Sequence, residues 1–232
     1  MGIYQSLIGL YIVVFILLQL VDLPKPTANE QQPRTRPFWE ITRQTTWKVS
    51  LLSAALGYAA MALIMTATPL SMQAHHHSFS ASAFVIQWHV IAMFMPSFFT
   101  GNLIQRFGSK NIMLVGIGLN LLCILINTQG QFFLSYWSAL ILLGVGWNFM
   151  FIAGTTLLTE TYRPEEKALV QGVNDVLVFG AAASGSLLAG VLQNQIGWET
   201  LNMVVAPPLL LLAGWLLWLK RGRGILVQQP IH

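Results

Sequence analysis

The chain has 232 residues, of which 55% are hydrophobic and only 9% are charged, and its mean hydropathy is +0.62. A soluble domain of this length would need far more polar surface to cover its core, so the composition predicts a protein of the lipid bilayer. The formal net charge is +4, but the Lys and Arg residues lie in short segments between apolar runs, which argues against nucleic-acid binding.

Seven segments are apolar over about 20 residues, the length that a helix needs to cross the hydrocarbon core of a bilayer. The first, residues 1–20, lacks the basic start and the small-residue cleavage site of a signal peptide, so it counts as a membrane span. The sequence therefore predicts an all-α, polytopic membrane protein with seven transmembrane helices. Their expected ranges are 1–20, 49–72, 81–104, 111–128, 137–159, 168–192 and 201–219.

The basic residues predict how these helices are oriented. All 12 Lys and Arg residues fall on one side of this arrangement, in alternate connections and in the tail at 220–232. The connections on the other side contain none, and by the positive-inside rule the basic side is cytoplasmic. We therefore expect an integral, multi-pass protein of the cell (inner) membrane, with its N-terminus outside and its C-terminal tail in the cytoplasm.

Residues 21–48 form the one long connection. Four prolines stand there among Asn, Gln, Thr and charged residues, a composition typical of an extended, mobile linker. Phe38, Trp39 and Trp47 are expected to rest at the level of the lipid headgroups. This cytoplasmic linker separates the single helix at 1–20 from a six-helix bundle at 49–219.

An internal repeat is visible when the chain is shifted so that Gly101 matches Gly190. Each copy contains three spans, so the second copy enters the membrane with the opposite orientation, as in the inverted repeats that build secondary transporters. The matched pairs are Gly101/Gly190, Leu103/Leu192, Gln105/Asn194, Gly108/Gly197, Ser97/Ser186, Leu51/Leu140, Gly57/Gly146, Tyr58/Trp147, Met61/Met150 and Thr66/Thr155.

Residues 101–110, which read GNLIQRFGSK, resemble a loop of the major facilitator superfamily. That loop has the pattern G-x-L-x-D-R-x-G-R-K and joins the second and third helices of each half. Gln105 replaces the acidic residue and Ser109 replaces a basic one, as is typical of the C-terminal half. Residues 162–168 also resemble the turn between the tenth and eleventh helices. The resemblance implies a cytoplasmic gate or loop motif made of Gly101, Leu103, Gln105, Arg106, Gly108 and Lys110.

The resemblance implies that the chain is the C-terminal part of a twelve-helix transporter. Residues 1–20 align with helix six, the last helix of a missing N-terminal bundle, and residues 49–219 align with helices seven to twelve. We then expect alternating access for a small organic solute, in contact with membrane lipid. The missing six-helix bundle, or a second copy of the chain, is the expected partner. No ATP-binding motif is present, so we expect a gradient to drive transport and no cofactor to take part.

The second and fifth predicted spans correspond to cavity-lining helices of the resembled superfamily. Their aromatic, soft apolar and hydrogen-bonding side chains are typical of a pocket for a small molecule. Packing between helices or contact with lipid would explain each of them as well. The candidate cavity residues are Tyr58, Met61, Thr66, Trp147, Asn148, Phe151 and Thr155.

Two ionisable residues inside predicted spans are candidates for proton or ion coupling. Asp175 is the only acid well inside a span, and an ionised carboxylate there needs a polar cavity or a partner. The alternative is a carboxylate near the cytoplasmic mouth that bonds Asn174 or Gln171. His89 could titrate near neutral pH, whereas its apolar helical neighbours favour a packing role.

Other chemistries have little support in the sequence. His75, His76 and His77 have no acid or cysteine nearby, so a solvated loop is favoured over a metal site. Cys123 is the only cysteine and predicts no disulfide within the chain. No nucleophile, base and orienting group converge at a recognisable spacing, so we do not expect an enzyme.

Two other functions compete with that of a transporter. A non-transporting remnant or membrane interaction module, which needs a separate N-terminal half, would have the same sequence features. A seven-helix receptor would share the predicted topology, but the inverted repeat and the short glycine turn argue against it.

Overall fold

The computed structural model describes residues 2–20 and 36–226, and their side chains at 4–20 and 36–221. Every regular element within these ranges is a helix, which confirms the predicted all-α class. Residues 21–35 of the predicted linker and the end of the tail lie outside the described residues. The helices are α1 (Gly2–Leu20), α2 (Phe38–Arg43), α3 (Thr45–Ala74), α4 (Phe79–Phe94), α5 (Ser97–Phe107), α6 (Ser109–Asn127), α7 (Phe133–Leu158), the 3₁₀ turn η1 (Pro164–Glu166) and α8 (Lys167–Leu226).

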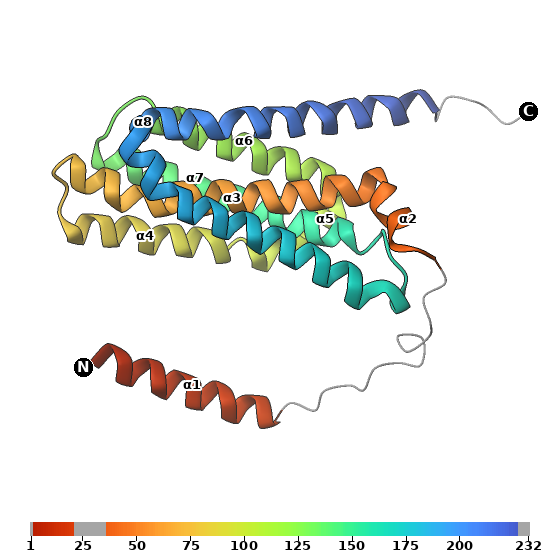
Figure 1. Ribbon diagram of the computed structural model, residues 1–232, viewed down its shortest axis with the longest axis horizontal. Coiled ribbons are helices and arrows are strands. Elements are labelled where there is room, and N and C mark those ends of the chain that lie inside the picture. The colour runs from red at the N-terminus through yellow and green to blue at the C-terminus, as the bar shows by residue number, and fades with distance from the viewer. Residues whose placement is uncertain (1, 21–35, 227–232) are drawn as a thin grey trace, which may run out of the picture.

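The long helices have the length and composition of membrane spans. Each of α3, α6, α7 and α8 is long and apolar enough to cross a membrane, and α4 and α5, which are bent by 43° relative to each other, meet the same criteria only when taken together. The bend lies at Pro96, because proline cannot donate the hydrogen bond that would continue the helix. The shorter apolar helix α1 lies apart from the others (Figure 1) and is exposed along its length.

Helix α8 contains two of the predicted spans. At ~1.5 Å per residue a straight helix of this length would extend roughly 90 Å, about three times the thickness of the hydrocarbon core. Gly197, with φ 77° and ψ 173°, breaks it into two arms. Figure 1 shows the chain reversing at this bend, so that the two arms lie on the same bundle.

Helices α3 and α7 lie side by side at the centre of the bundle, where the first arm of α8 covers α3 and where α4 and α6 pack on α7 (Figure 1). In the internal repeat, α3 of the first copy corresponds to α7 of the second. Gly108 and Gly197 also occupy corresponding positions, and both have positive φ, at 81° and 77°. Each makes the turn between two helices in a conformation that favours glycine.

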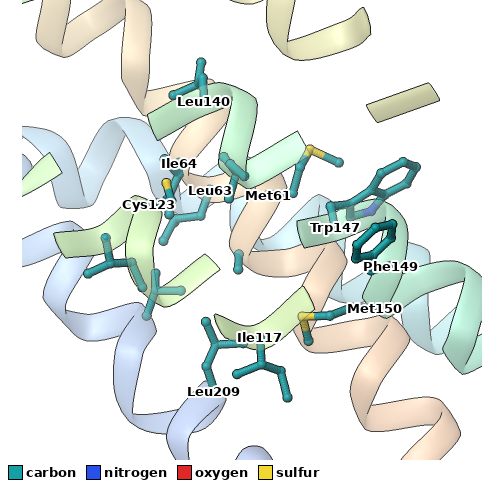
Figure 2. Close-up of a cluster of buried hydrophobic side chains, with 14 of the residues drawn as sticks. Met61, Leu63, Ile64, Ile117, Cys123, Leu140, Trp147, Phe149, Met150 and Leu209 are labelled. Atoms are coloured by element: carbon teal, nitrogen blue, oxygen red, sulfur yellow. The ribbon is translucent and has the colours of Figure 1, made fainter. Parts of the chain in front are cut away.

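Small residues let the helices of the core approach closely, as is common where helices pack in lipid. A methyl group on Gly116 would lie 2.8 Å from the carbonyl oxygen of Gly146, and one on Gly57 would lie 3.0 Å from the Cβ of Met150. Figure 2 shows Met61, Met150 and Cys123 among the buried side chains of α3, α6 and α7. The hydrophobic core therefore lies between the two repeats.

The aromatic residues near α2 differ from the sequence expectation. Trp47 is buried and its ring meets Phe38 edge to face at 6.3 Å, so neither extends into the headgroup layer as expected. Both pack in a small cluster with Ile41 of α2, which is also buried. Trp39 alone faces outward, beneath the guanidinium of Arg43 at 4.2 Å. Trp47 and Phe38 are packed in this way because α2 folds back onto the bundle, and the headgroup position of Trp39 stays a prediction.

Candidate functional site

Five aromatic side chains from four helices form a continuous group, here called the aromatic cluster. Tyr58 of α3 lies at its centre and meets Trp147, Phe151 and Phe179 edge to face, at centroid distances of 5.2, 5.6 and 5.6 Å. Trp147 and Phe151 of α7 are stacked at 5.3 Å, and Phe94 of α4 lies 6.1 Å from Trp147. Three of the predicted cavity residues, Tyr58, Trp147 and Phe151, therefore contact one another. Phe94 and Phe179 were not predicted and belong to the same cluster.

The aromatic cluster forms part of the bundle surface. Phe94 is 58% exposed and Phe179 is 51% exposed, whereas Trp147 beneath them is buried. The indole Nε1 of Trp147 has no hydrogen-bond partner among the described residues. A planar molecule could therefore contact exposed ring faces and edges here, with a buried donor close by.

Polar groups lie on both sides of the aromatic cluster. Thr66 follows Tyr58 by about two helical turns, and its hydroxyl lies 3.1 Å from that of Ser186 on α8. Thr155 follows Phe151 by about one turn and donates to its carbonyl oxygen at 3.0 Å. The two predicted threonines therefore flank the cluster at opposite ends, and neither hydroxyl is left without a hydrogen bond.

The other two predicted cavity residues point into the bundle. Met61 is buried in the core (Figure 2). Asn148 is also buried, and its Nδ2 donates to the carbonyl oxygen of Met93 and to the hydroxyl of Ser97, both at 2.7 Å. Its Oδ1 accepts from Thr100 at 2.7 Å. The Asn148 amide thereby ties α7 to both sides of the bend between α4 and α5.

The two candidate coupling residues lie on different helices. Asp175 is exposed on α8, about one turn before Phe179 and thus on the same face as the aromatic cluster. Its Oδ1 accepts a long hydrogen bond of 3.3 Å from Asn174, as the alternative interpretation anticipated. His89 is fully buried between α4 and α7, and its Nδ1 lies 2.7 Å from the carbonyl oxygen of Leu140. The structure does not bring these two residues into one site.

The predicted gate motif is mostly helical. Its first seven residues end α5, Gly108 makes the turn, and Lys110 begins α6. Gln105 and Arg106 are exposed, and the guanidinium of Arg106 lies 5.3 Å from the ring of the adjacent Phe107. Leu103 packs against the core. The helices thus hold Gln105 and Arg106 at one end of the bundle, where their polar groups face outward.

A buried ion pair that the sequence did not reveal lies at the same end of the bundle. Glu166 of η1 is fully buried, and its two carboxylate oxygens accept from Nε and Nη2 of Arg36 at 2.6 and 2.8 Å. The same Nη2 donates to the carbonyl oxygen of Thr161 at 2.8 Å, and the backbone N–H of Arg163 donates to Glu166 at 2.9 Å. Acids in the first turn of a helix usually complement its dipole, so the sequence alone does not mark Glu166 as the partner of a distant arginine.

The pair changes the proton affinity of both groups, which lie outside the membrane-spanning segments. The hydrogen bond from Arg36 is the main cause that lowers the pKa of Glu166 below its ordinary range, with a smaller contribution from the Arg163 N–H. The hydrogen bond to Glu166 raises the pKa of Arg36 further above neutrality. Both residues are therefore charged at neutral pH.

Two of the three histidines between α3 and α4, His75 and His77, contact Tyr136. The hydroxyl of Tyr136 lies 2.7 Å from that of Ser71 and 3.3 Å from Nδ1 of His75. The ring of His77 meets Tyr136 edge to face, and its Nε2 lies 2.8 Å from the carbonyl oxygen of Gln131. In the part of the chain that the structure describes, no group of three or more metal-binding side chains occurs.

A family model described as Major Facilitator Superfamily matches residues 2–174 and also residues 50–227. The chain belongs to the major facilitator superfamily. This confirms the resemblance drawn from residues 101–110, and it agrees with the bundle of apolar helices. Several of the relatives that match the chain are named MFS-type transporters.

The Riboflavin transporter RfnT of Brucella anthropi is 39% identical to the chain over 203 residues, which cover 88% of this chain and 51% of the relative. The uncharacterized MFS-type transporter YdeG of Bacillus subtilis is 32% identical over 222 residues, 91% of this chain and 51% of the relative. The Methylenomycin A resistance protein of Bacillus subtilis is 27% identical over 166 residues, 68% of this chain and 35% of the relative. The chain thus spans about half the length of the first two of these relatives.

This superfamily member departs from the motif of its family at Gln105, where the pattern has an acid. In the described structure Gln105 is exposed, and its side chain hydrogen bonds no other described residue. The buried carboxylate at this end of the bundle comes instead from Glu166, and its cation comes from Arg36 of the linker. The linker is therefore fixed to the bundle by charge at the position where it enters α2.

Proposed function

We propose that this chain forms the C-terminal half of a secondary transporter, which moves a small, planar organic solute across the membrane by alternating access. The observation that carries the proposal is the aromatic cluster around Tyr58, because it exposes several rings beside a buried indole donor. Rings that face one another favour a conjugated, flat ligand. The relative from Brucella anthropi is named a riboflavin transporter, and riboflavin contains such a ring system.

The proposed parts follow the expected division of the chain. Residues 1–20 act as the last helix of an N-terminal bundle, 21–48 as the cytoplasmic linker, 49–219 as the C-terminal bundle and 220–232 as the tail. The N-terminus lies outside the cell membrane and the basic end faces the cytoplasm. A separate six-helix bundle, or a second copy, completes the transport path. Half-length coverage of the relatives and the position of the basic residues support this proposal.

In the proposed mechanism the solute binds at the aromatic cluster and the two bundles then rock about it. Asp175, on the same face as Phe179, carries the coupling ion or proton toward the basic end, and His89 supports the packing of α4. Arg106 and Lys110 help to close that end of the path. The contact between α3 and α8 suits such a movement, since small residues at Ala59 and Gly185 leave little side chain to interlock.

The solute class is tested by binding of riboflavin to the purified chain in lipid nanodiscs, measured by quenching of flavin fluorescence. We expect saturable binding that Phe179→Ala weakens about tenfold, the effect of losing one good aromatic contact. Phe98→Ala is the matched control, because Phe98 is 90% exposed on α5 and lies outside the aromatic cluster. Equal loss in both variants, or no saturable binding, would contradict the proposed solute class.

Half-length coverage of the relatives also favours a second candidate function, a module that does not transport alone. Riboflavin uptake into a strain that cannot make riboflavin separates the two. The chain is expressed alone and together with residues of the Brucella anthropi relative that precede the matched half. Uptake only with the added half supports a split transporter, and no uptake in either case supports the non-transporting module.

A further inference from the structure

A pocket of about 660 Å³ opens between α3 and α4, near the loop that joins them. Volumes of this size are typical of sites for small organic ligands. We call it the α3–α4 pocket. Its walls combine an apolar surface with amide, hydroxyl and imidazole groups. The residues that line it are Pro69, Leu70, Gln73, His77, Phe79, Ser82, Ala83, Ile86 and Gln87.

The residues that line the α3–α4 pocket lie on the same faces of α3 and α4 as members of the aromatic cluster, further along each helix. On α3, Pro69 and Gln73 follow Tyr58 by 11 and 15 residues, which at ~3.6 residues per turn places all three on one face. On α4, Gln87 precedes Phe94 by seven residues, or about two turns and about 10 Å of rise. Tyr58 and Phe94 both contact Trp147. The pocket thus begins about 10 Å from Phe94 along α4 and about 16 Å from Tyr58 along α3, which makes Gln87 the amide nearer to the cluster.

Two amides on opposite walls of the pocket are available to a ligand. Gln73 of α3 and Gln87 of α4 are both exposed, and neither side chain hydrogen bonds another described residue. Each amide can donate and accept hydrogen bonds. In an apolar surrounding, such groups bind a hydroxylated or amide-bearing ligand in preference to an apolar one.

We infer that the α3–α4 pocket is a second subsite, which binds the hydrogen-bonding chain of a solute whose planar ring lies on the aromatic cluster. This inference rests on the proposed function, since the ring must first bind the cluster. The cluster then selects for a flat ring system, and Gln73 and Gln87 select for hydroxyl groups on the attached chain.

The test compares two flavins that share one ring system. Riboflavin has a chain of hydroxylated carbons, and lumiflavin has a methyl group in its place. Both are titrated into the 232-residue chain in nanodiscs, because this chain alone lines the pocket. We expect riboflavin to bind about tenfold more tightly than lumiflavin, the effect of one or two added hydrogen bonds.

Variants then assign that preference to the pocket. Gln73→Leu combined with Gln87→Leu should bring riboflavin down to the affinity of lumiflavin and leave lumiflavin unchanged. Ala83→Phe, which fills the pocket and keeps both amides, should have the same selective effect. Gln195→Leu is the matched control, since Gln195 is an exposed glutamine of α8 outside the pocket.

The outcomes separate the two proposals. Equal affinity of the wild-type chain for both flavins overturns the subsite and leaves the aromatic cluster as the binding site. The subsite is also overturned if the amide variant and Ala83→Phe weaken both flavins alike, or if neither changes the preference. If the wild-type chain binds neither flavin, the proposed solute class falls and the subsite falls with it.

Discussion

Arg36 and Glu166, 130 positions apart, form a two-pronged ion pair in which Nε and Nη2 donate to Oε1 and Oε2 at 2.6 and 2.8 Å. The Glu166 carboxylate is buried, whereas the Arg36 side chain is 24% exposed. The pair connects the start of α2 with the turn between α7 and α8, so both segments should depend on it for stability.

We expect Arg36→Ala to destabilise the chain by about 2 kcal/mol, because it leaves a buried carboxylate without its charged donor. Thermal unfolding in detergent, followed by circular dichroism, measures the change. Arg43→Ala is the control, since the guanidinium of Arg43 lies over the exposed Trp39 ring and should contribute little. Equal effects of the two changes would show that the ion pair is not the cause.

The ion pair should also make stability depend on pH. The pKa of Glu166 is lowered in the folded chain, so the contribution of the pair is complete above the ordinary pKa of glutamate and is lost as the pH falls through the folded value. Arg36 stays charged throughout this range. The difference in unfolding temperature between the wild-type chain and Glu166→Gln should be constant from about pH 7 to about pH 5 and should narrow below that. A difference that grows on acidification contradicts this assignment.

Gly108→Ala and Gly197→Ala should each cost about 1–3 kcal/mol, since both positions have positive φ with extended ψ, a region that is nearly restricted to glycine. Gly118→Ala is the control, because Gly118 lies in α6 with open space around it. Replacing a helical glycine there should be neutral or slightly stabilising. Unfolding curves of the three variants measure these changes in stability. An unchanged stability of Gly108→Ala or Gly197→Ala would show that the positive φ at that turn does not require glycine.

Gly185→Ala should separate α8 from α3. A methyl group there would lie 2.7 Å from the carbonyl oxygen of Ala59, so the helices must move apart, at a cost of about 1–3 kcal/mol. Gly180→Ala is the matched control on the same helix, with no atom within 4 Å of the added methyl group. Two introduced cysteines, one on α3 and one on α8, can be labelled to measure the distance between these helices. That distance should increase only in Gly185→Ala.

Asp175→Asn should lower solute uptake about tenfold or more in the transporter formed with a separate N-terminal half, because an acid on the transport face is a candidate carrier of the coupling ion. Glu160→Gln is the control, since Glu160 is an exposed acid in the connection between α7 and α8. Uptake equal to that of the wild type in both variants would remove Asp175 from the mechanism.

The lengths of the apolar segments were sufficient to predict the helical class, and the repeat identified α3 and α7 as equivalent helices, which lie side by side in the structure. The repeat also identified Gly108 and Gly197 as matched turns, because a positive φ restricts the choice of residue. Residues 81–104 were predicted to form one helix, whereas the structure has two helices, α4 and α5, with a bend between them. Pro96 was visible in the sequence, but the 43° bend and the Asn148 bonds that hold it depend on tertiary contacts.

Side-chain direction was the part that the sequence could not provide. Tyr58 and Met61 are three residues apart on one helix, yet Tyr58 lies at the bundle surface and Met61 lies in the core. Phe179 joins the aromatic cluster from α8, where the sequence singled out Asp175 and not Phe179. The contact of Arg36 with Glu166 joins distant segments through an irregular turn, for which no periodic signal exists.

The ion pair also limits how far α1 can be from the bundle. A connection as long as residues 21–48 would allow α1 to lie far from the bundle, but Arg36 is bound to Thr161 and Glu166. Only the segment 21–35 then joins α1 to this anchor, and at ~3.5 Å per residue its contour is at most roughly 50 Å. Whatever bundle α1 belongs to must therefore remain within that radius, and without the ion pair the next point of attachment is α2, which begins two residues after Arg36 and packs through Ile41.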